Sequence, residues 1–375
     1  MSEVNWHGKP YYSLDAYLKN RYGHKCYKVA LNAHMTCPNR DGTLDTRGCV
    51  FCSKGGSGEF AVDIDNSDIK YNTGAGCHTE TLTGGTALAS LEVQLQEGVG
   101  LIRRKLGANA NDILPNTVHN VYEQFNPLAG PCIIAYFQAY TNTYAPVSYL
   151  RQIFSLALSH PLVCGISIAT RPDCLPPEVL ALLDELRTEF PDKFLWVELG
   201  LQTIHEKTAR FIRRGYELSC FEKAVGELNR LDLPVIVHVI LGLPDETRLQ
   251  MLETVEYLNK VGIFGVKLQL LHVLESTDLA ETYRKGTFSV LTKEAYLDIL
   301  IDCLVHLSPE IVVHRVTGDG PKRILIAPQW SGNKRDVLNS LHQLMYKENA
   351  RQGRLYLQKM GTRCPTGSKS QTAIN

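Results

Sequence analysis

The stretch VCGISIATRPDCLPPEVLALLDELRTEFPDKFLWVELGLQ, residues 163–202, contains two apolar, β-rich runs that flank an amphipathic segment. The runs cover residues 163–170 and 194–202, and the amphipathic segment covers residues 177–189. That segment opens with Pro177 and Glu178, residue types that favour the first turn of a helix. A strand, a helix and a second strand at this spacing predict a βαβ unit with parallel strands.

The same alternation continues on both sides of this unit and predicts an α/β fold with six parallel strands. The other four strands are expected at residues 26–33, 132–138, 235–243 and 266–273. The other helices are expected at residues 147–159, 204–213, 219–231 and 246–260.

Polar residues within these apolar strands indicate a barrel. Side chains alternate across a strand, so Glu198 and Gln202 share one face, as do Lys267 and Gln269. A barrel interior gives such groups a common polar region, and barrel active sites gather at the carboxyl ends of the strands. A buried lysine needs a partner, so Lys267 is expected to pair with a carboxylate or an anionic ligand. His238 stands alone in its strand and is interpreted as a hydrogen-bonded core residue.

Breaks in the alternation divide the chain. The stretch 61–130 is too long for a connection between barrel strands and is interpreted as an insertion with one helical segment near 89–106. The predicted organisation is an N-terminal leader at 1–25, a barrel at 26–310, a basic C-terminal extension at 311–363 and a disordered tail at 364–375.

Composition sets limits on the function. The 375 residues include 39 Lys or Arg and 39 Asp or Glu, and this zero net charge argues against a general polyanion binder. The charges are unevenly placed, because residues 311–375 hold eleven basic and three acidic side chains. The start, MSEVNWHGKP, is unlike a signal peptide, and no apolar run is long enough to span a membrane. The expected location is therefore the cytoplasm.

Three of the eleven cysteines form a cluster directly after the first predicted strand, in the spacing C-x11-C-x2-C. Cys37, Cys49 and Cys52 lie in one loop, where three thiolates would repel one another unless a cation or an oxidised pair stabilised them. A zinc site would take Cys26 or His34 as its fourth ligand. A disulfide does not suit a reducing cytosol, and a C-x-x-C redox pair leaves one cysteine without a role. A three-cysteine iron–sulfur cluster with one open iron needs only these three ligands.

Several long motifs carry a family resemblance. They are TCPNRDGTL (36–44), GCVFC (48–52), YFQAYTNTYAP (136–146), ATRPDCLP (169–176), WVELGLQTIHEKTARFIRRGY (196–216), LGLPDET (241–247) and VKLQLLHVLESTDLA (266–280). Together they resemble the YhcC-like family of the radical S-adenosylmethionine (SAM) superfamily, which is related to the branch of the elongator catalytic subunit. The resemblance extends from about residue 5 to about residue 330, apart from the insertion.

The resemblance implies a partial (β/α)6 barrel of the TIM type that binds a 4Fe–4S cluster and SAM and takes electrons from a reductase or another donor. Cys37, Cys49 and Cys52 would bind the cluster. Where the family has a Gly-Gly-Glu-like turn for the methionine amino group, this chain has Gln138 and Thr141. The other candidate SAM contacts are Arg171 for the carboxylate, Glu198 with Gln202 for the ribose, and Gly242 for the adenine.

The substrate is not fixed by these motifs. Relatives in the elongator-like branch modify tRNA, and the basic segment 311–375 is a candidate surface for RNA. Its densest part contains Arg315, Lys322, Arg323, Lys334 and Arg335. The alternative function is a non-enzymatic zinc-binding or redox module on a barrel scaffold.

Overall fold

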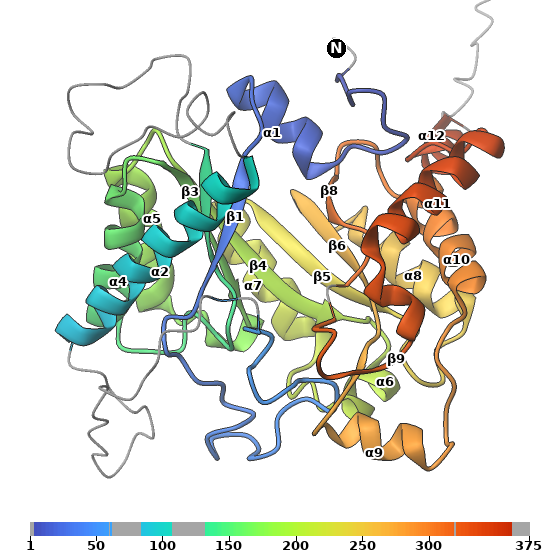
Figure 1. The fold of residues 1–375 in the computed structure, drawn as a ribbon, viewed down its shortest axis with the longest axis horizontal. Coiled ribbons are helices and arrows are strands. Elements are labelled where there is room, and N and C mark those ends of the chain that lie inside the picture. Colours follow the sequence, from blue (N-terminus) through green and yellow to red (C-terminus); the bar gives the residue numbers. More distant parts are fainter. Residues whose placement is uncertain (1–3, 60, 62–83, 107–131, 319, 362–375) are drawn as a thin grey trace, which may run out of the picture.

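A single parallel sheet of seven strands organises the protein (Figure 1). The computed structural model describes residues 4–59, 61, 84–106, 132–318 and 320–361. The strands are β1 (Tyr27–Leu31), β2 (Ile133–Phe137), β3 (Val163–Thr170), β4 (Phe194–Gln202), β5 (Val235–Leu241), β6 (Gly265–Leu270) and β8 (Val312–Arg315). Each strand pairs with the next in chain order, from β1 at one edge to β8 at the other. The sheet curls into an open half-barrel, which confirms the predicted α/β barrel class.

The six strands expected from the sequence are all present, and β8 adds a seventh. β8 lies in the stretch that the sequence analysis assigns to the C-terminal extension, yet Val312 and Val313 pair with β6. Four residues are too few to show a strand periodicity in the sequence, so only the pairing reveals this strand.

Helices cover the outer face of the sheet (Figure 1). On this face lie α4 (Val147–Ser159), α5 (Pro177–Glu189), α6 (Glu206–Phe211), α7 (Leu218–Arg230), α8 (Arg248–Leu258) and α10 (Lys293–His306). Their apolar sides pack against the strands, as where Phe154 of α4 meets Phe137 of β2 edge to face with ring centroids 5.0 Å apart. The helix α2 (Gly84–Leu106) packs on β1 and α4, which confirms the helical segment expected in the insertion.

The remaining elements flank the sheet and its helices, and α11 and α12 pack against α10. They are α1 (Leu14–Tyr22), α9 (Asp278–Arg284), α11 (Lys334–Lys347), α12 (Arg354–Gly361), the antiparallel pair β7 (Val273–Leu274) and β9 (Leu325–Ala327), and the 3-10 turns Pro172–Cys174 and Gln329–Gly332. The predicted tail at 364–375 lies outside the described residues. Among the described residues, no helix combines the length and the apolar composition that a bilayer crossing requires.

The inner face of the sheet changes character along the strands. At the amino ends, Trp196, Phe194 and Phe264 form an aromatic cluster that Tyr17 of α1 closes, with the Tyr17 and Phe264 centroids 5.0 Å apart. Polar side chains follow in the middle of the barrel, and a cavity opens at the carboxyl ends. The aromatic cluster therefore closes one end of the barrel and leaves the other end for a site.

Candidate functional site

A cavity of about 250 Å³ occupies the carboxyl end of the half-barrel, near the lower size limit of small-molecule sites. Its mouth is formed by the loop of residues 37–59, which follows β1. Its floor is formed by inward-facing side chains of the strands, among them Tyr136, Glu198, His238 and Arg315. The position agrees with the rule that barrel active sites lie at strand carboxyl ends.

The structure brings the three clustered cysteines to one place. Cys37, Cys49 and Cys52 all line the mouth of the cavity, and all three are free thiols that are partly exposed. Phe51, between the last two, turns toward the apolar cluster beneath the loop. The cysteine loop therefore presents three sulfur ligands to the same space.

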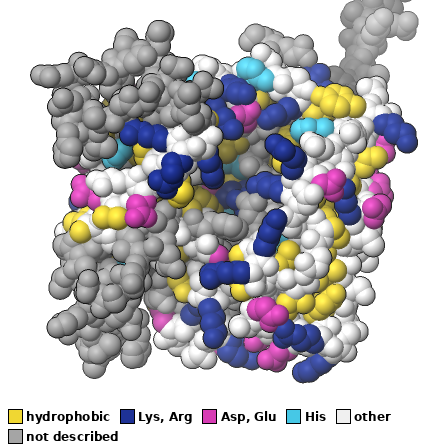
Figure 2. Space-filling view, in the orientation of Figure 1, with side chains coloured by type: hydrophobic (Ala, Val, Ile, Leu, Met, Phe, Trp, Pro, Cys, Tyr) yellow, Lys and Arg dark blue, Asp and Glu magenta, His cyan; other side chains and the backbone are white. Residues whose placement is uncertain are grey.

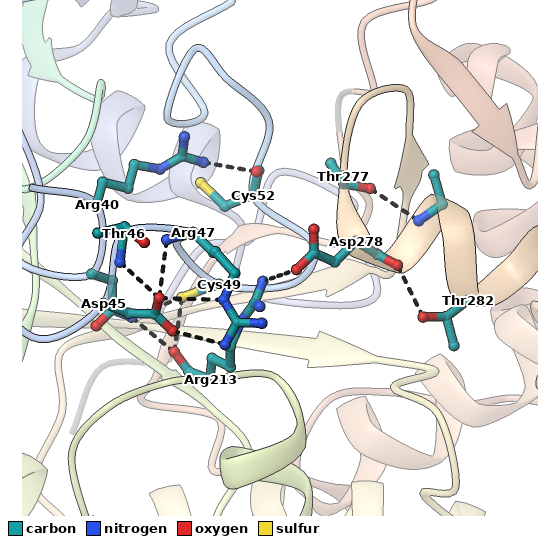
Figure 3. A network of polar contacts seen from close by, with 12 residues as sticks. Arg40, Asp45, Thr46, Arg47, Cys49, Cys52, Arg213, Thr277, Asp278 and Thr282 are labelled. Carbon is teal, nitrogen blue, oxygen red and sulfur yellow. Dashed lines mark hydrogen bonds and ion pairs between the residues drawn. The ribbon is translucent and has the colours of Figure 1, made fainter. Parts of the chain in front are cut away.

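Polar contacts fix this loop to the barrel (Figure 3). The buried Asn39 amide donates to the Arg213 carbonyl oxygen over 2.8 Å, and the Cys49 thiol lies 3.5 Å from the same oxygen. Arg213 in turn forms an ion pair with Asp278 of α9 over 2.6 Å. Arg40 donates to the carbonyl oxygens of Cys52 and of the next residue over 2.8 and 2.6 Å. The turn after α6 thus positions Cys49, and Arg40 positions Cys52.

One glycine of the loop is required by a close approach. Gly56 has φ of +59°, and a Cβ atom there would lie 2.4 Å from the ring of Tyr140. Tyr140 itself donates from its hydroxyl to the Lys54 carbonyl oxygen over 2.5 Å. The close fit between the loop and the segment after β2 closes one side of the cavity mouth.

Two of the thiols, Cys49 and Cys52, are held in a setting that disfavours their charged form. Burial, with a smaller effect of the neighbouring Cys52 and Cys37, raises the pKa of the Cys49 thiol to about 12, although Arg171 opposes it. Burial also raises the pKa of Cys52, which Arg40 opposes. A cationic centre bound among the three sulfurs would remove this penalty, because thiolates are the form that ligates metals.

The donor set fits a cluster better than a single zinc ion. Neither Cys26 nor His34 lines the cavity: Cys26 packs beside the aromatic cluster at the opposite end of the barrel, and the His34 ring lies 3.3 Å from the Ser90 hydroxyl. In the described part of the chain, no group of three or more His, Cys, Asp or Glu is placed to hold one metal ion. Three cysteines around a cavity suit a 4Fe–4S cluster with one open iron, whose sulfur ligands lie farther apart than those of zinc.

Three of the expected SAM contacts, Gln138, Thr141 and Gln202, line the cavity. Gln202 sits at a bulge at the end of β4 with φ of +65°, and its buried amide oxygen has no hydrogen-bond partner among the described residues. Gln138 donates to the Ser57 carbonyl oxygen over 2.6 Å, and Thr141 is nearly fully buried. A buried amide oxygen without a partner is costly, so Gln202 is the group that a bound ligand would satisfy.

Two other expected contacts also line the cavity, but protein groups already occupy their side chains. The Arg171 guanidinium forms a two-point pair with Asp173 over 2.9 and 2.6 Å and donates to the Arg214 carbonyl oxygen. Both oxygens of Glu198, which is fully buried, accept hydrogen bonds from side chains of other strands of the sheet. Lys267 is one of those donors, so it has the carboxylate partner that its burial predicts.

Gly242 is not among the residues that line the cavity, unlike the other expected contacts. β5 ends at Leu241, and the following turn places Gly242 with φ of +85° beside Leu291. The contact expected between this turn and the adenine stays a prediction.

Sequence reasoning missed several residues around the cavity. Arg40, Arg214 and Tyr216 all line it, and Arg214 is almost fully buried. Arg315, which the sequence analysis assigned to the candidate RNA surface, also lines the cavity. The run RRGY at 213–216 lies at the end of the family motif 196–216, and its pair of arginines before a glycine was the signal that could have identified Arg214. His238 is hydrogen-bonded as expected, because its Nε2 lies 2.7 Å from Glu198, but its ring also forms part of the cavity floor.

His238 is expected to make the protein sensitive to acid. Burial lowers the pKa of its imidazole to about 4, nearby Lys267 and Arg315 add to the effect, and Glu198 opposes it. Because the unfolded pKa is about 6.5, stability should be complete above pH 6.5 and fall toward pH 4, by about 2 kcal/mol at pH 5. Urea unfolding at pH 7.5 and 5.0 measures this loss. His238→Gln should lose less stability between the two pH values, and equal losses would exclude His238 as the cause.

Comparison with known proteins identifies relatives over most of the chain. Residues 46–258 match the family model of the radical SAM superfamily, and residues 263–347 match the radical SAM C-terminal domain. The uncharacterized protein YtqA of Bacillus subtilis is 37% identical over 348 residues, which are 93% of each chain. The protein YhcC of Escherichia coli K12 is 30% identical over 84% of this chain and 86% of its own.

More distant relatives share part of the chain. A tRNA uridine(34) acetyltransferase of Methanocaldococcus jannaschii is 26% identical over 204 residues, which cover 53% of this chain and 34% of that protein. The solved structure of archaeal Elp3 from Methanocaldococcus infernus superposes with a TM-score of 0.56 and 15% identity, over 74% of this chain and 65% of that one. At this identity the superposition establishes a shared fold.

Proposed function

The chain belongs to the radical SAM superfamily, in the group that contains YtqA and YhcC, and we propose that Cys37, Cys49 and Cys52 hold its 4Fe–4S cluster. The observation that carries the proposal is that these three free thiols from one loop line the same cavity mouth at the carboxyl ends of the strands. A 4Fe–4S cluster held by these three residues would supply the electron for reductive cleavage of SAM, the chemistry by which radical SAM enzymes begin hydrogen abstraction from a substrate.

The residues of the chain would bind and orient SAM and exclude water around it. We assign the polar contacts to Gln138, Thr141 and Gln202, because each lines the cavity and the Gln202 oxygen lacks a partner among the described residues. Arg171 and Glu198 are positioning residues, because their side chains hold the turn after α6 and the barrel floor. An external reductase would supply the electron.

Anaerobic reconstitution with iron and sulfide tests the assignment. The wild-type protein should be brown, bind about four irons per chain, and form 5′-deoxyadenosine when dithionite and SAM are added. A colourless protein that retains one zinc ion, or a brown protein that forms no 5′-deoxyadenosine, would contradict the proposed function.

An RNA substrate, tRNA in particular, has support from charge placement and from a relative. Lys322 and Arg323 are exposed and follow Pro321, which lines the cavity, and Lys54 is exposed in the cysteine loop. Figure 2 shows Lys and Arg side chains along the middle of the face shown in Figure 1. Such cations would supply contacts to RNA phosphates. In addition, a relative that matches 204 residues is named tRNA uridine(34) acetyltransferase, a name that gives tRNA as the substrate of that protein.

Replacing both Lys322 and Arg323 with glutamine should weaken tRNA binding. Each lost phosphate contact makes the negative slope of log K against log salt shallower by about 1. The slope of the double variant should therefore be shallower by about 2. Filter binding of unfractionated tRNA, repeated at salt concentrations between about 50 and 200 mM, measures this slope. The control is Lys223→Gln with Lys260→Gln, two exposed residues near the outer-face helices. Equal slopes for the two double variants would exclude this surface.

A further inference from the structure

The described part of the cavity wall contains two acidic side chains, Glu59 and Glu198. Glu59 belongs to the cysteine loop at the mouth, and Glu198 belongs to β4 and lies at the floor. The arginines on the wall are hydrogen-bond donors that cannot accept. A ligand group that carries N–H donors and a positive charge therefore depends on one of these two acids for an anionic partner.

Glu198 is already saturated by the protein. One of its oxygens accepts from Lys28 over 3.1 Å and from Ser167 over 2.6 Å. The other accepts from His238 over 2.7 Å and from Lys267. A carboxylate has about four acceptor positions, and these four donors fill them. The floor acid therefore has no acceptor position left for a ligand.

Glu59, in contrast, has acceptor positions to spare. Its Oε1 accepts from the hydroxyl of the buried Ser53, the one hydrogen-bond partner of this carboxylate in the described part of the chain. The carboxylate also lies close to the loop backbone, since a Cβ atom at Gly55 would be 3.1 Å from the same oxygen. The loop thus holds one oxygen of Glu59 and leaves the other for a ligand.

The Glu59 carboxylate lies near the proposed cluster ligands. Burial is the main cause of the raised pKa of the Cys52 thiol, and the charge of Glu59 contributes to it. Burial likewise raises the pKa of Tyr140, again with a contribution from Glu59. Both of these side chains line the cavity mouth. Glu59 therefore acts on the space in front of the sulfurs.

Hydrogen bonds fix this end of the cysteine loop to the segment after β2. The Tyr140 amide donates to the Gly56 carbonyl oxygen over 2.9 Å, and the Gln138 side chain donates to the Ser57 carbonyl oxygen over 2.6 Å. These bonds come from the residues directly before Glu59. They hold the acid on the same side of the mouth as Gln138, one of the neutral groups assigned to SAM.

SAM requires an acceptor at the end that faces the sulfurs. Its amino group carries N–H donors, and its sulfonium adds a positive charge nearby. Gln138, Thr141 and Gln202 can accept through neutral oxygens, whereas a hydrogen bond to an ionised group is roughly twice as strong. Glu59 is the acid on the described cavity wall whose carboxylate is not already saturated.

We propose that Glu59 binds the amino group of SAM through the carboxylate oxygen that Ser53 leaves open. This rests on the proposed function, because it places SAM at the cysteine end of the same cavity. The loop of residues 37–59 would then supply both the three sulfur ligands and the anionic contact to SAM.

Equilibrium dialysis with the cluster-loaded protein tests the assignment with three probes. S-adenosylhomocysteine has the amino group of SAM without the sulfonium charge, and 5′-methylthioadenosine has neither. Glu59→Gln keeps the size of the side chain and removes its charge, so it should weaken SAM and S-adenosylhomocysteine by the same factor, about tenfold. The affinity for 5′-methylthioadenosine should not change. Glu59→Asp keeps the charge and should bind SAM more tightly than Glu59→Gln. The control is Glu178→Gln, an exposed position on α5, which should bind all three probes like the wild type.

Several results would overturn the assignment. They are an unchanged affinity of Glu59→Gln for SAM, a loss for SAM alone, which would place Glu59 at the sulfonium, and an equal loss for all three probes. Tighter binding of SAM by Glu59→Gln would also overturn it, because Glu59 would then compete with SAM for the open iron. Iron analysis separates this inference from the proposed function. A wrong cluster assignment would leave the wild-type protein without iron, whereas a wrong Glu59 assignment would give one of these affinities at normal iron content.

Discussion

Cys49→Ala is expected to abolish iron binding, from about four irons per chain to nearly none, and with it all formation of 5′-deoxyadenosine. An open-iron cluster has three protein ligands, so the loss of one leaves two iron atoms without a protein sulfur. Among the three proposed ligands, Cys49 has a thiol that lies 3.5 Å from both the Arg213 carbonyl oxygen and the Asn39 amide, so the fold fixes its position. Iron and sulfide analysis after anaerobic reconstitution, with product measured by chromatography, gives the result.

Cys303→Ala is the matched control. Cys303 is fully buried on α10, packs within the main apolar core and does not line the cavity. This variant should keep its iron and its product at a cost of about 1 kcal/mol in stability, as expected for a small buried truncation. If Cys49→Ala retained iron and product as fully as Cys303→Ala, Cys49 would not be a cluster ligand.

Arg214→Met is expected to lower the free energy of unfolding by about 3 kcal/mol, because it leaves buried backbone acceptors without their donor. Its guanidinium pairs with Glu206 over 3.0 Å and donates to the carbonyl oxygens of Thr203 and Tyr216 over 2.7 and 2.9 Å. Methionine fills a similar volume and leaves all of these acceptors unpaired. The midpoint of urea unfolding measures the loss.

The same substitution should also lower iron content, because Arg214 follows the residue whose carbonyl oxygen holds Cys49 and Asn39. The control is Arg210→Met, an exposed position near the end of α6. A surface change of this kind should stay within about 0.5 kcal/mol. Equal midpoints for Arg214→Met and Arg210→Met would show that the buried arginine does not stabilise the turn after α6.

Local patterns in the sequence were sufficient for the fold class. β3, β4, α4 and α5 begin and end at the residues that the periodicity predicts. Each of these elements is long enough to show its own period, and parallel strands buried on both faces are distinct from the amphipathic helices between them. β8 is too short for this, and its place in the sheet depends on β6.

The candidate site was predictable in part for the same reason. The spacing of Cys37, Cys49 and Cys52 is local, so one loop was bound to carry all three sulfurs. The SAM contacts required directions that spacing does not give. A bulge at the end of β4 places Gln202 among the residues that line the cavity, and no spacing rule predicts that bulge.

The sequence by itself determined a parallel α/β barrel with three cysteines in the loop after its first strand, because periodicity and spacing are properties of neighbouring residues. Only the tertiary structure decided what those cysteines face. Glu198 lies 170 residues from Lys28, and closure of the sheet brings them within 3.1 Å. The hydrogen-bond network around Glu198 likewise forms only because the curled sheet brings Ser167, His238 and Lys267 from three other strands to one buried carboxylate, where an unpaired charge would be costly.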